Sequence, residues 1–132
     1  MVEDSQQEAR ALLPRAVEFH GHLGPFLILG LRMGVIARSM LKAQNHKDLA
    51  AIMLVDLEPP VSCAVDGVQV ASGCTLGKGT IRVSGSTDQV AGEFHAGSRI
   101  CTIRVKPEVL KELLDVVKKA NERLWKVICF GA

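Results

Sequence analysis

Residues 20–37 read HGHLGPFLILGLRMGVIA, and this stretch decides much of the fold. Proline is favoured in the first turn of a helix, so Pro25 predicts a helix that begins directly after the loop carrying the two histidines. From Phe26 to Ala37 the sequence is apolar on nearly all sides of that helix, which predicts burial on most sides. Gly30 and Gly34 lie about one turn apart. The two glycines either form a flat strip that allows close approach of another helix or a sheet, or are tolerated by the helix without any packing role.

The segment before the two histidines predicts a first helix. Ser5-Gln-Gln-Glu8 has the form of a capping box, in which the two side chains satisfy free backbone amides, so the helix is expected to begin there. Pro14 lies inside the pattern, where a proline loses a hydrogen bond and clashes with the preceding turn. The helix is therefore expected either to kink or to become regular only near Pro14.

The segments after the buried helix alternate between strand and helix patterns. Residues 49–57 form a nearly continuous apolar run of strand length, as a central strand would. Ser62 is a natural N-cap for a short helix from Cys63 to about Ala71, which Gly73 ends. Three more strands, a helix opened by Pro107 and a last short strand are expected, the strands at residues 80–84, 89–95, 98–105 and 125–130. The pattern predicts a single α+β domain spanning residues 1–132.

Composition excludes several classes of partner. Hydrophobic residues make up 48% of the chain and charged residues 23%, which excludes disorder of the whole chain. Four Phe, one Trp and no Tyr argue against base stacking, and a net charge of +2 predicts no polyanion footprint. The longest apolar stretch, residues 26–41, is interrupted by Arg32 and Arg38 and falls short of the ~20 apolar residues of a membrane span. We expect neither nucleic acid nor a membrane as partner.

The four cysteines are expected to be reduced thiols. The start of the chain, from Met1 to Gln6, carries no secretory signal pattern, so a cytoplasmic location and free thiols are expected. Cys101 lies inside a strand pattern and Cys129 lies near the C-terminus, and we expect both to serve packing.

Two histidines and a cysteine are candidates for metal chemistry. His20 and His22 flank Gly21, whose backbone freedom lets both rings point the same way, and neutral imidazole binds Zn, Cu, Fe or Ni. The alternative is two ordinary loop histidines. Cys63 follows the expected N-cap, where the helix dipole lowers the pKa of a thiol and favours the thiolate that attacks or binds metal. The alternative is a small buried apolar residue.

The stretch Ser72-Gly-Cys-Thr-Leu-Gly-Lys-Gly79 is a candidate anion site. Three glycines, a lysine and a hydroxyl suit a cradle of backbone amides around an anion. The G-x-x-x-x-G-K-[ST] spacing of a P-loop is absent, and the alternative is a flexible loop between a helix and a strand.

The spacing of the cysteines limits how a metal ion is bound. If Cys63 opens a helix and Cys74 follows its end, roughly nine helical residues separate them by over ~13 Å. The expected site therefore combines His20 and His22 with one of these cysteines, or is completed across a dimer interface. Three N/S ligands and an open position are typical of a catalytic or transfer site.

Several of these motifs together resemble the FmdE-like family of formylmethanofuran dehydrogenase proteins. The motifs are Phe19-His-Gly-His-Leu-Gly-Pro25, Gly30-Leu-Arg32, Cys63-Ala-Val-Asp-Gly-Val-Gln69 and the stretch from Ser72 to Gly79. The resemblance implies a thioredoxin-like α+β core, with a mixed sheet of about five strands flanked by helices, and a homodimer with a cleft near its interface. Many members carry a C-terminal zinc finger, and this chain resembles the form without it.

The resemblance also implies the residues of the site. It points to a divalent metal ion, zinc, with His20, His22, Cys63 and Cys74 as ligands, and to a cleft that contains Asp66, Gln69, Thr75 and Lys78. The chain departs from the family pattern at Gly24, where members often have a cysteine. That departure removes one thiolate, which either weakens metal binding or shifts the preferred metal toward harder ligation.

Three functions are weighed on these grounds. The first is a metal-binding accessory or regulatory protein that resembles the FmdE component of molybdenum or tungsten formylmethanofuran dehydrogenase, with the other proteins of that enzyme as partners. The sequence has no motif for a pterin or an iron–sulfur cluster, so the catalytic subunit is not expected. The second is a small thiol- or metal-dependent enzyme in a dimer-interface cleft, with Cys63 as nucleophile beside His20 and His22, and Asp66 orienting a partner. The third is an interaction module that dimerises or docks.

Overall fold

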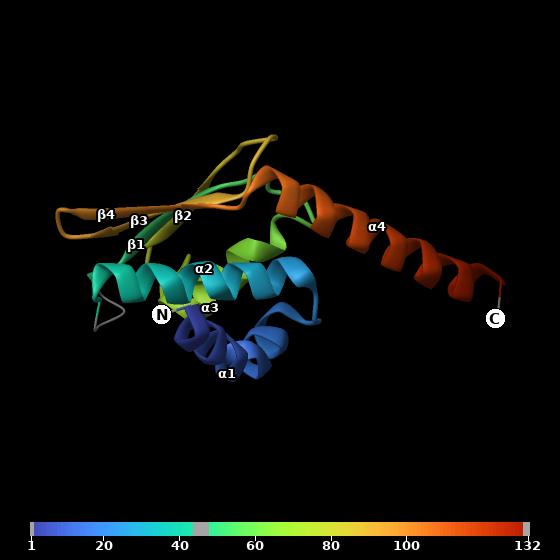
Figure 1. Cartoon of the computed structure of the whole chain (residues 1–132), viewed down its shortest axis with the longest axis horizontal. Coiled ribbons are helices and arrows are strands. Elements are labelled where there is room, and N and C mark those ends of the chain that lie inside the picture. The colour runs from blue at the N-terminus through green and yellow to red at the C-terminus, as the bar shows by residue number, and fades with distance from the viewer. Residues whose placement is uncertain (1, 44–47, 131–132) are drawn as a thin grey trace.

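The computed structural model describes residues 2–43 and 48–130, and side chains for residues 4–43 and 48–120. Within these residues the chain forms four helices and a four-stranded sheet (Figure 1). In chain order the elements are α1 (Val2–His20), α2 (Pro25–Leu41), β1 (Ala50–Leu54), α3 (Cys63–Ser72), β2 (Ile81–Ser84), β3 (Ala91–Ala96), β4 (Arg99–Arg104) and α4 (Pro107–Phe130). The predicted α+β class is confirmed.

The sheet is mixed, with the strand order β2-β1-β3-β4. β1 and β2 run parallel, because α3 provides the crossover that parallel neighbours need, whereas β3 pairs antiparallel with both β1 and β4. The described sheet has four strands rather than about five, and the strand predicted at residues 125–130 is wrong. Beyond Pro107 no glycine or proline stops the helical pattern, so α4 continues to Phe130.

Helix α2 lies between the sheet and α1 (Figure 1). Phe26 and Met33 on one side of α2 belong to the main core, together with Met53 of β1 and Phe94 of β3. Leu27, Leu31 and Val35 on another side pack with Ala9 and Ala16 of α1. Burial against two layers explains why the sequence of α2 is apolar nearly all round.

Helices α2 and α3 cross with their backbones in contact. A Cβ on Gly30 would lie 2.0 Å from the carbonyl oxygen of Ala64, and one on Gly67 would lie 2.3 Å from that of Leu27. The glycine strip of α2 is therefore a helix-packing surface, and its partner is α3. This crossing places the beginning of α3 beside the beginning of α2, where the candidate site forms.

The first helix differs from its prediction. α1 begins at Val2, ahead of the expected start at Ser5, and continues through Pro14 as one helix. Ser5 is buried, with 5% of its surface exposed, so it lies inside the helix instead of capping it. α3 ends as predicted at Gly73, whose φ of 78° is the left-handed conformation that glycine adopts readily. None of the described helices combines the length and the apolar character that crossing a membrane requires.

Candidate metal site

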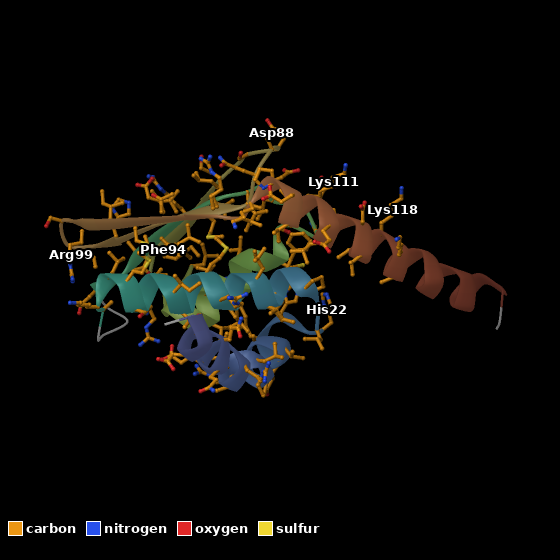
Figure 2. The ribbon with its side chains drawn as sticks, viewed as in Figure 1. His22, Asp88, Phe94, Arg99, Lys111 and Lys118 are labelled. Atoms are coloured by element: carbon orange, nitrogen blue, oxygen red, sulfur yellow. The ribbon has the colours of Figure 1, made fainter. Side chains whose placement is uncertain are left out.

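The connection between α1 and α2 and the beginning of α3 bring His20, His22 and Cys63 together. His20 ends α1, His22 follows it in the loop, and Cys63 begins α3. Gly21, with a φ of 104°, turns the chain between the two histidines. One ligand atom from each of the three residues lies within 4.8 Å of the other two. Figure 2 shows His22 beside the beginning of α2, well away from Arg99 at the tip of the β3–β4 hairpin.

The imidazole of His20 is held at one nitrogen and unpartnered at the other. Its Nδ1 lies 2.6 Å from Oδ2 of Asp66, and Gln69 Nε2 donates to the other oxygen of that carboxylate at 3.1 Å. Among the described residues, Nε2 of His20 is buried and has no hydrogen-bond partner. A carboxylate that accepts from Nδ1 fixes the tautomer in which Nε2 carries a lone pair, as in many histidine metal ligands.

The donor group fits a transition-metal ion. Zinc bonds of 2.0–2.3 Å in a tetrahedral shell place ligand atoms roughly 3.3–3.6 Å apart. The observed separations, all within 4.8 Å, need only small side-chain rotations to reach that range. Imidazole nitrogen and thiolate sulfur are both zinc ligands, and the buried lone pair of His20 Nε2 gains a partner when an ion binds.

Gly24 leaves one side of the donor group open. A Cβ on Gly24 would lie 3.7 Å from Nε2 of His22, so a side chain at this position would reach the site. The donors line a pocket of about 180 Å³, together with residues that include Pro60 before α3 and Val116 and Val117 of α4. The geometry thus offers three protein ligands and room for one small exogenous ligand.

The pKa of Cys63 moves in the direction opposite to the prediction. Burial of the thiol and the negative charge of Asp66 raise the pKa of Cys63, and a backbone hydrogen bond lowers it by less. Ser62 occupies the N-cap position, but its side chain forms no capping hydrogen bond. The prediction from the helix dipole alone is wrong because it omitted burial and Asp66, one turn away. A cation at the site would favour the thiolate again.

The other cysteines lie away from this group. Cys74 is fully buried in the main core and is not part of the described donor group, in line with the separation expected from the helix length. Burial raises the pKa of its thiol. Cys101 is buried in β4, as predicted for packing, while the side chain of Cys129 lies outside the described residues. The three described cysteines, Cys63, Cys74 and Cys101, are free thiols.

The loop after α3 does not offer its amides to an anion. The N–H groups of Gly73, Cys74, Thr75, Leu76, Lys78, Gly79 and Thr80 all donate to acceptors within the chain. These amides of the predicted backbone cradle are therefore already occupied by internal bonds, so a ligand would bind there mainly through side chains.

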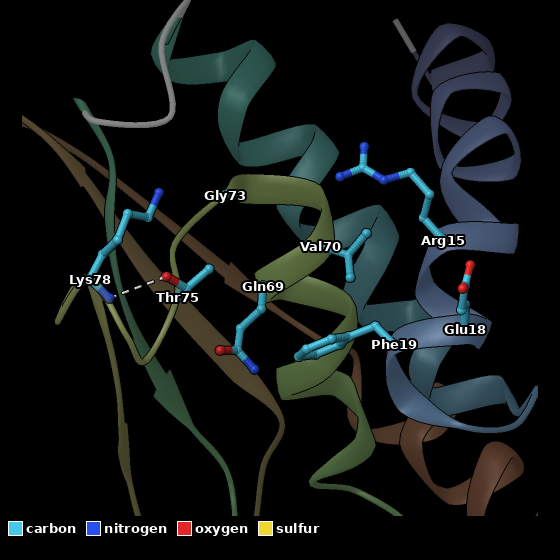
Figure 3. Close-up of a pocket in the computed structure, with 8 residues that line it drawn as sticks. All are labelled: Arg15, Glu18, Phe19, Gln69, Val70, Gly73, Thr75 and Lys78. Atoms are coloured by element: carbon cyan, nitrogen blue, oxygen red, sulfur yellow. Dashed lines mark hydrogen bonds between the residues drawn. The ribbon is translucent and has the colours of Figure 1, made fainter.

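Side chains from this loop line a second, larger pocket of about 520 Å³ (Figure 3). Thr75, Lys78 and Gln69, which were predicted to bind a ligand, all lie there. Arg15, Glu18 and Phe19 of α1 also line it, and sequence reasoning missed all three. They lie about fifty residues before the loop, and only the packing of α1 against α3 brings the two segments together.

Fold and site together define a class: an α+β protein whose helix junctions hold a partly buried His/His/Cys donor group beside a mixed sheet. The family model FmdE, described as "Molybdenum formylmethanofuran dehydrogenase operon", matches residues 19–127. The chain therefore belongs to the FmdE family, as its motifs predicted.

One curated relative is a protein of Archaeoglobus fulgidus named "Probable S-adenosyl-L-methionine-binding protein". It is 43% identical over 82 residues, which cover 58% of this chain and 21% of the relative. The chain thus matches about a fifth of that protein's length.

Proposed function

We propose that this protein is a metal-binding accessory or regulatory protein that holds one divalent ion, zinc, through His20, His22 and Cys63. The observation that carries the proposal is the imidazole of His20, whose Nδ1 is fixed by Asp66 while its buried Nε2 has no partner among the described residues. An unpaired buried nitrogen costs free energy, and a metal ion removes that cost.

The residues around the ion have distinct roles in this proposal. His20, His22 and Cys63 hold the ion, and Asp66 orients His20 and keeps its Nδ1 protonated. Gly24 leaves space for a further ligand. A bound divalent ion supplies Lewis acidity at that open position, which suits sensing, transfer or activation of a small ligand.

The family supports extending the proposal to the cellular setting. Its description refers to the operon of molybdenum formylmethanofuran dehydrogenase, so we extend the proposal to the subunits of that enzyme as partners. A homodimer in the cytoplasm is part of the same proposal. The alternative of Cys63 as the nucleophile of a small enzyme is less favoured, because burial and Asp66 raise the pKa of its thiol.

Elemental analysis of purified protein, refilled with zinc and passed over a desalting column, tests the proposal. We expect about one equivalent of metal in the unchanged protein, and its loss in His20→Ala, His22→Ala and Cys63→Ser. His95→Ala is the matched control, because His95 pairs with Glu93 on the sheet and should leave the metal content unchanged. Equal metal content in all variants, or none in any protein, would refute the proposed site.

A further inference from the structure

The larger pocket is lined by Gln69, which bonds to Asp66, but by none of the three metal donors. Its walls are α1, α3 and the loop that follows α3, and its volume of about 520 Å³ falls within the range of small-molecule sites. The proposed function makes no use of this pocket.

The charges of the pocket favour an anion. Figure 3 shows Arg15 on α1 and Lys78 on the loop, at opposite sides of the pocket with α3 between them. Among the described residues, neither side chain forms an ion pair, since the ion pairs present join His20 to Asp66 and His95 to Glu93. Glu18 is the one acidic residue in the lining, which leaves a surplus of positive charge.

The apolar part of the lining favours a ring or short chain on the same ligand. Phe19 is 60% exposed, and it lines the pocket beside Val70. In Figure 3 its ring extends from α1 toward Gln69 and Val70. A large exposed aromatic side chain within a pocket flanked by cations suits a small organic anion better than an inorganic ion.

Gln69 links this pocket to the metal site. It lines the pocket, donates to Oδ1 of Asp66 at 3.1 Å, and accepts from the amide of Leu76 in the loop at 3.2 Å. The other oxygen of Asp66 holds His20. Three hydrogen bonds between Thr75 and Thr80, through backbone and side-chain groups, hold the loop together. A ligand that fixes the loop therefore also fixes Gln69, Asp66 and His20.

We propose that the pocket between Arg15 and Lys78 binds a small organic anion, and that Gln69 couples its occupancy to the metal site. The coupling rests on the proposed metal function, whereas the anion site does not. A negative charge near the Asp66–His20 pair favours a cation at His20, so the two ligands should strengthen each other's binding. By linkage the effect is reciprocal, and typical couplings are roughly fivefold or more.

Benzenesulfonate is a suitable probe, because it combines a ring with an anion and is a poor metal ligand. Titrated into ¹⁵N-labelled metal-free protein, it should shift the amide signals of Phe19, Gln69 and Thr75. Arg15→Gln or Lys78→Gln should each weaken binding by roughly tenfold, the usual effect of losing a hydrogen bond to a charged group. Arg10→Gln and Lys111→Gln remove the same charges from exposed positions outside the pocket and should have no effect. Absence of these shifts, or equal weakening in the controls, overturns the anion site.

Zinc affinity, measured by competition with a chelating dye, tests the coupling. With saturating benzenesulfonate it should rise roughly fivefold in the unchanged protein and not at all in Gln69→Ala. A preserved amide spectrum confirms that the variant is folded. If benzenesulfonate leaves the zinc affinity of the unsubstituted protein the same, the coupling is overturned. If zinc does not bind at all, the proposed metal function and the coupling are both overturned. The titration of metal-free protein with benzenesulfonate then still decides whether the anion site exists.

Discussion

At the residue scale, Asp66 is the side chain on which the orientation of His20 depends. Its carboxylate lies 2.6 Å from Nδ1 of His20 and acts on the donor group only through that ring and through the charge it places near Cys63. Asp66→Asn should therefore leave the three ligands in place and lower zinc affinity by roughly 10–100-fold, as is usual for partners of metal-binding histidines. Competition with a chelating dye measures this.

Asp88→Asn is the control for that substitution, since Asp88 is an exposed carboxylate in the loop before β3. Its zinc affinity should equal that of the unchanged protein. An Asp66→Asn protein that binds zinc as tightly as Asp88→Asn would show that the Asp66–His20 pair does not tune the site.

The cysteines should differ in their reactivity toward iodoacetamide. Cys63 is partly exposed and should react in the metal-free protein, though more slowly than a free thiol at neutral pH, because burial and Asp66 raise its pKa. As pH rises toward that raised pKa its rate should increase. Cys74 is fully buried and should react only after denaturation. Peptide mapping by mass spectrometry follows each site separately.

The same alkylation experiment is repeated with zinc bound. Zinc should protect Cys63 from iodoacetamide and leave the alkylation rates of Cys74 and Cys101 unchanged. Alkylation of Cys63 at the same rate with and without zinc would mean that its sulfur is not a ligand.

Sequence reasoning anticipated which candidate side chains lie together better than it anticipated their surroundings. The spacing of His20 and His22 predicted that their rings lie together, and the length of the helix that begins at Cys63 predicted that Cys63 and Cys74 do not share one ion within a chain; which cysteine joins the histidines was left open. The direction of the Cys63 pKa shift was not predictable, because it depends on burial in the folded chain. The unpartnered Nε2 of His20 is likewise a property of packing alone.

At the scale of elements, the α2–α3 crossing holds the site together. Gly30→Ala would drive a methyl group into the backbone of α3, 2.0 Å from the carbonyl oxygen of Ala64. Overpacking of this kind costs roughly 1–3 kcal/mol, and contact with rigid backbone places this case at the upper end. Urea denaturation should show that loss of stability, and zinc affinity should fall as the beginning of α3 moves away from α2.

Gly77→Ala is the matched control for the crossing. A Cβ at Gly77 has no atom within 4 Å, so the free energy of unfolding should change by less than about 0.5 kcal/mol. Equal stability of the Gly30→Ala and Gly77→Ala proteins would contradict the close approach of the two helices.

Local patterns predicted most elements but not all of their ends. Pro25 and Gly73 mark the beginning of α2 and the end of α3 as expected, because proline fixes φ at a helical value and glycine readily adopts the left-handed conformation that ends a helix. The beginning of α1 and the helical end of α4 were misjudged. In both places a short local motif, the capping box at Ser5 or the strand-like residues 125–130, was given more weight than the helical periodicity of the surrounding residues.

At the scale of the whole molecule, α4 extends beyond the body of the chain (Figure 1). Leu110, Leu113 and Val117 pack against the main core, whereas Leu114 and Val116 are 38% and 52% exposed. We propose that a second copy of the chain covers Leu114, because Val116 lies on a different side of the helix and lines the pocket of the metal donors. Leu114→Glu should then shift the molar mass measured by light scattering from dimer toward monomer. Lys111→Glu, an exposed substitution in the same helix, should not.

The arrangement of the sheet could not be predicted from the sequence. The strands were recognisable one by one, but the order β2-β1-β3-β4 depends on which strand edges meet after the helices pack. The same holds for the larger pocket, which forms only where α1 lies against α3 and its loop.

X-ray absorption at the zinc edge of the refilled protein tests the central claim most directly. The account predicts two imidazole nitrogens at about 2.0–2.1 Å from the zinc, one sulfur at about 2.3 Å, and one nitrogen or oxygen ligand at the open position. The sulfur contribution should vanish in Cys63→Ser. A shell with no sulfur, or one with several sulfurs that persist in Cys63→Ser, would contradict a site built from His20, His22 and Cys63.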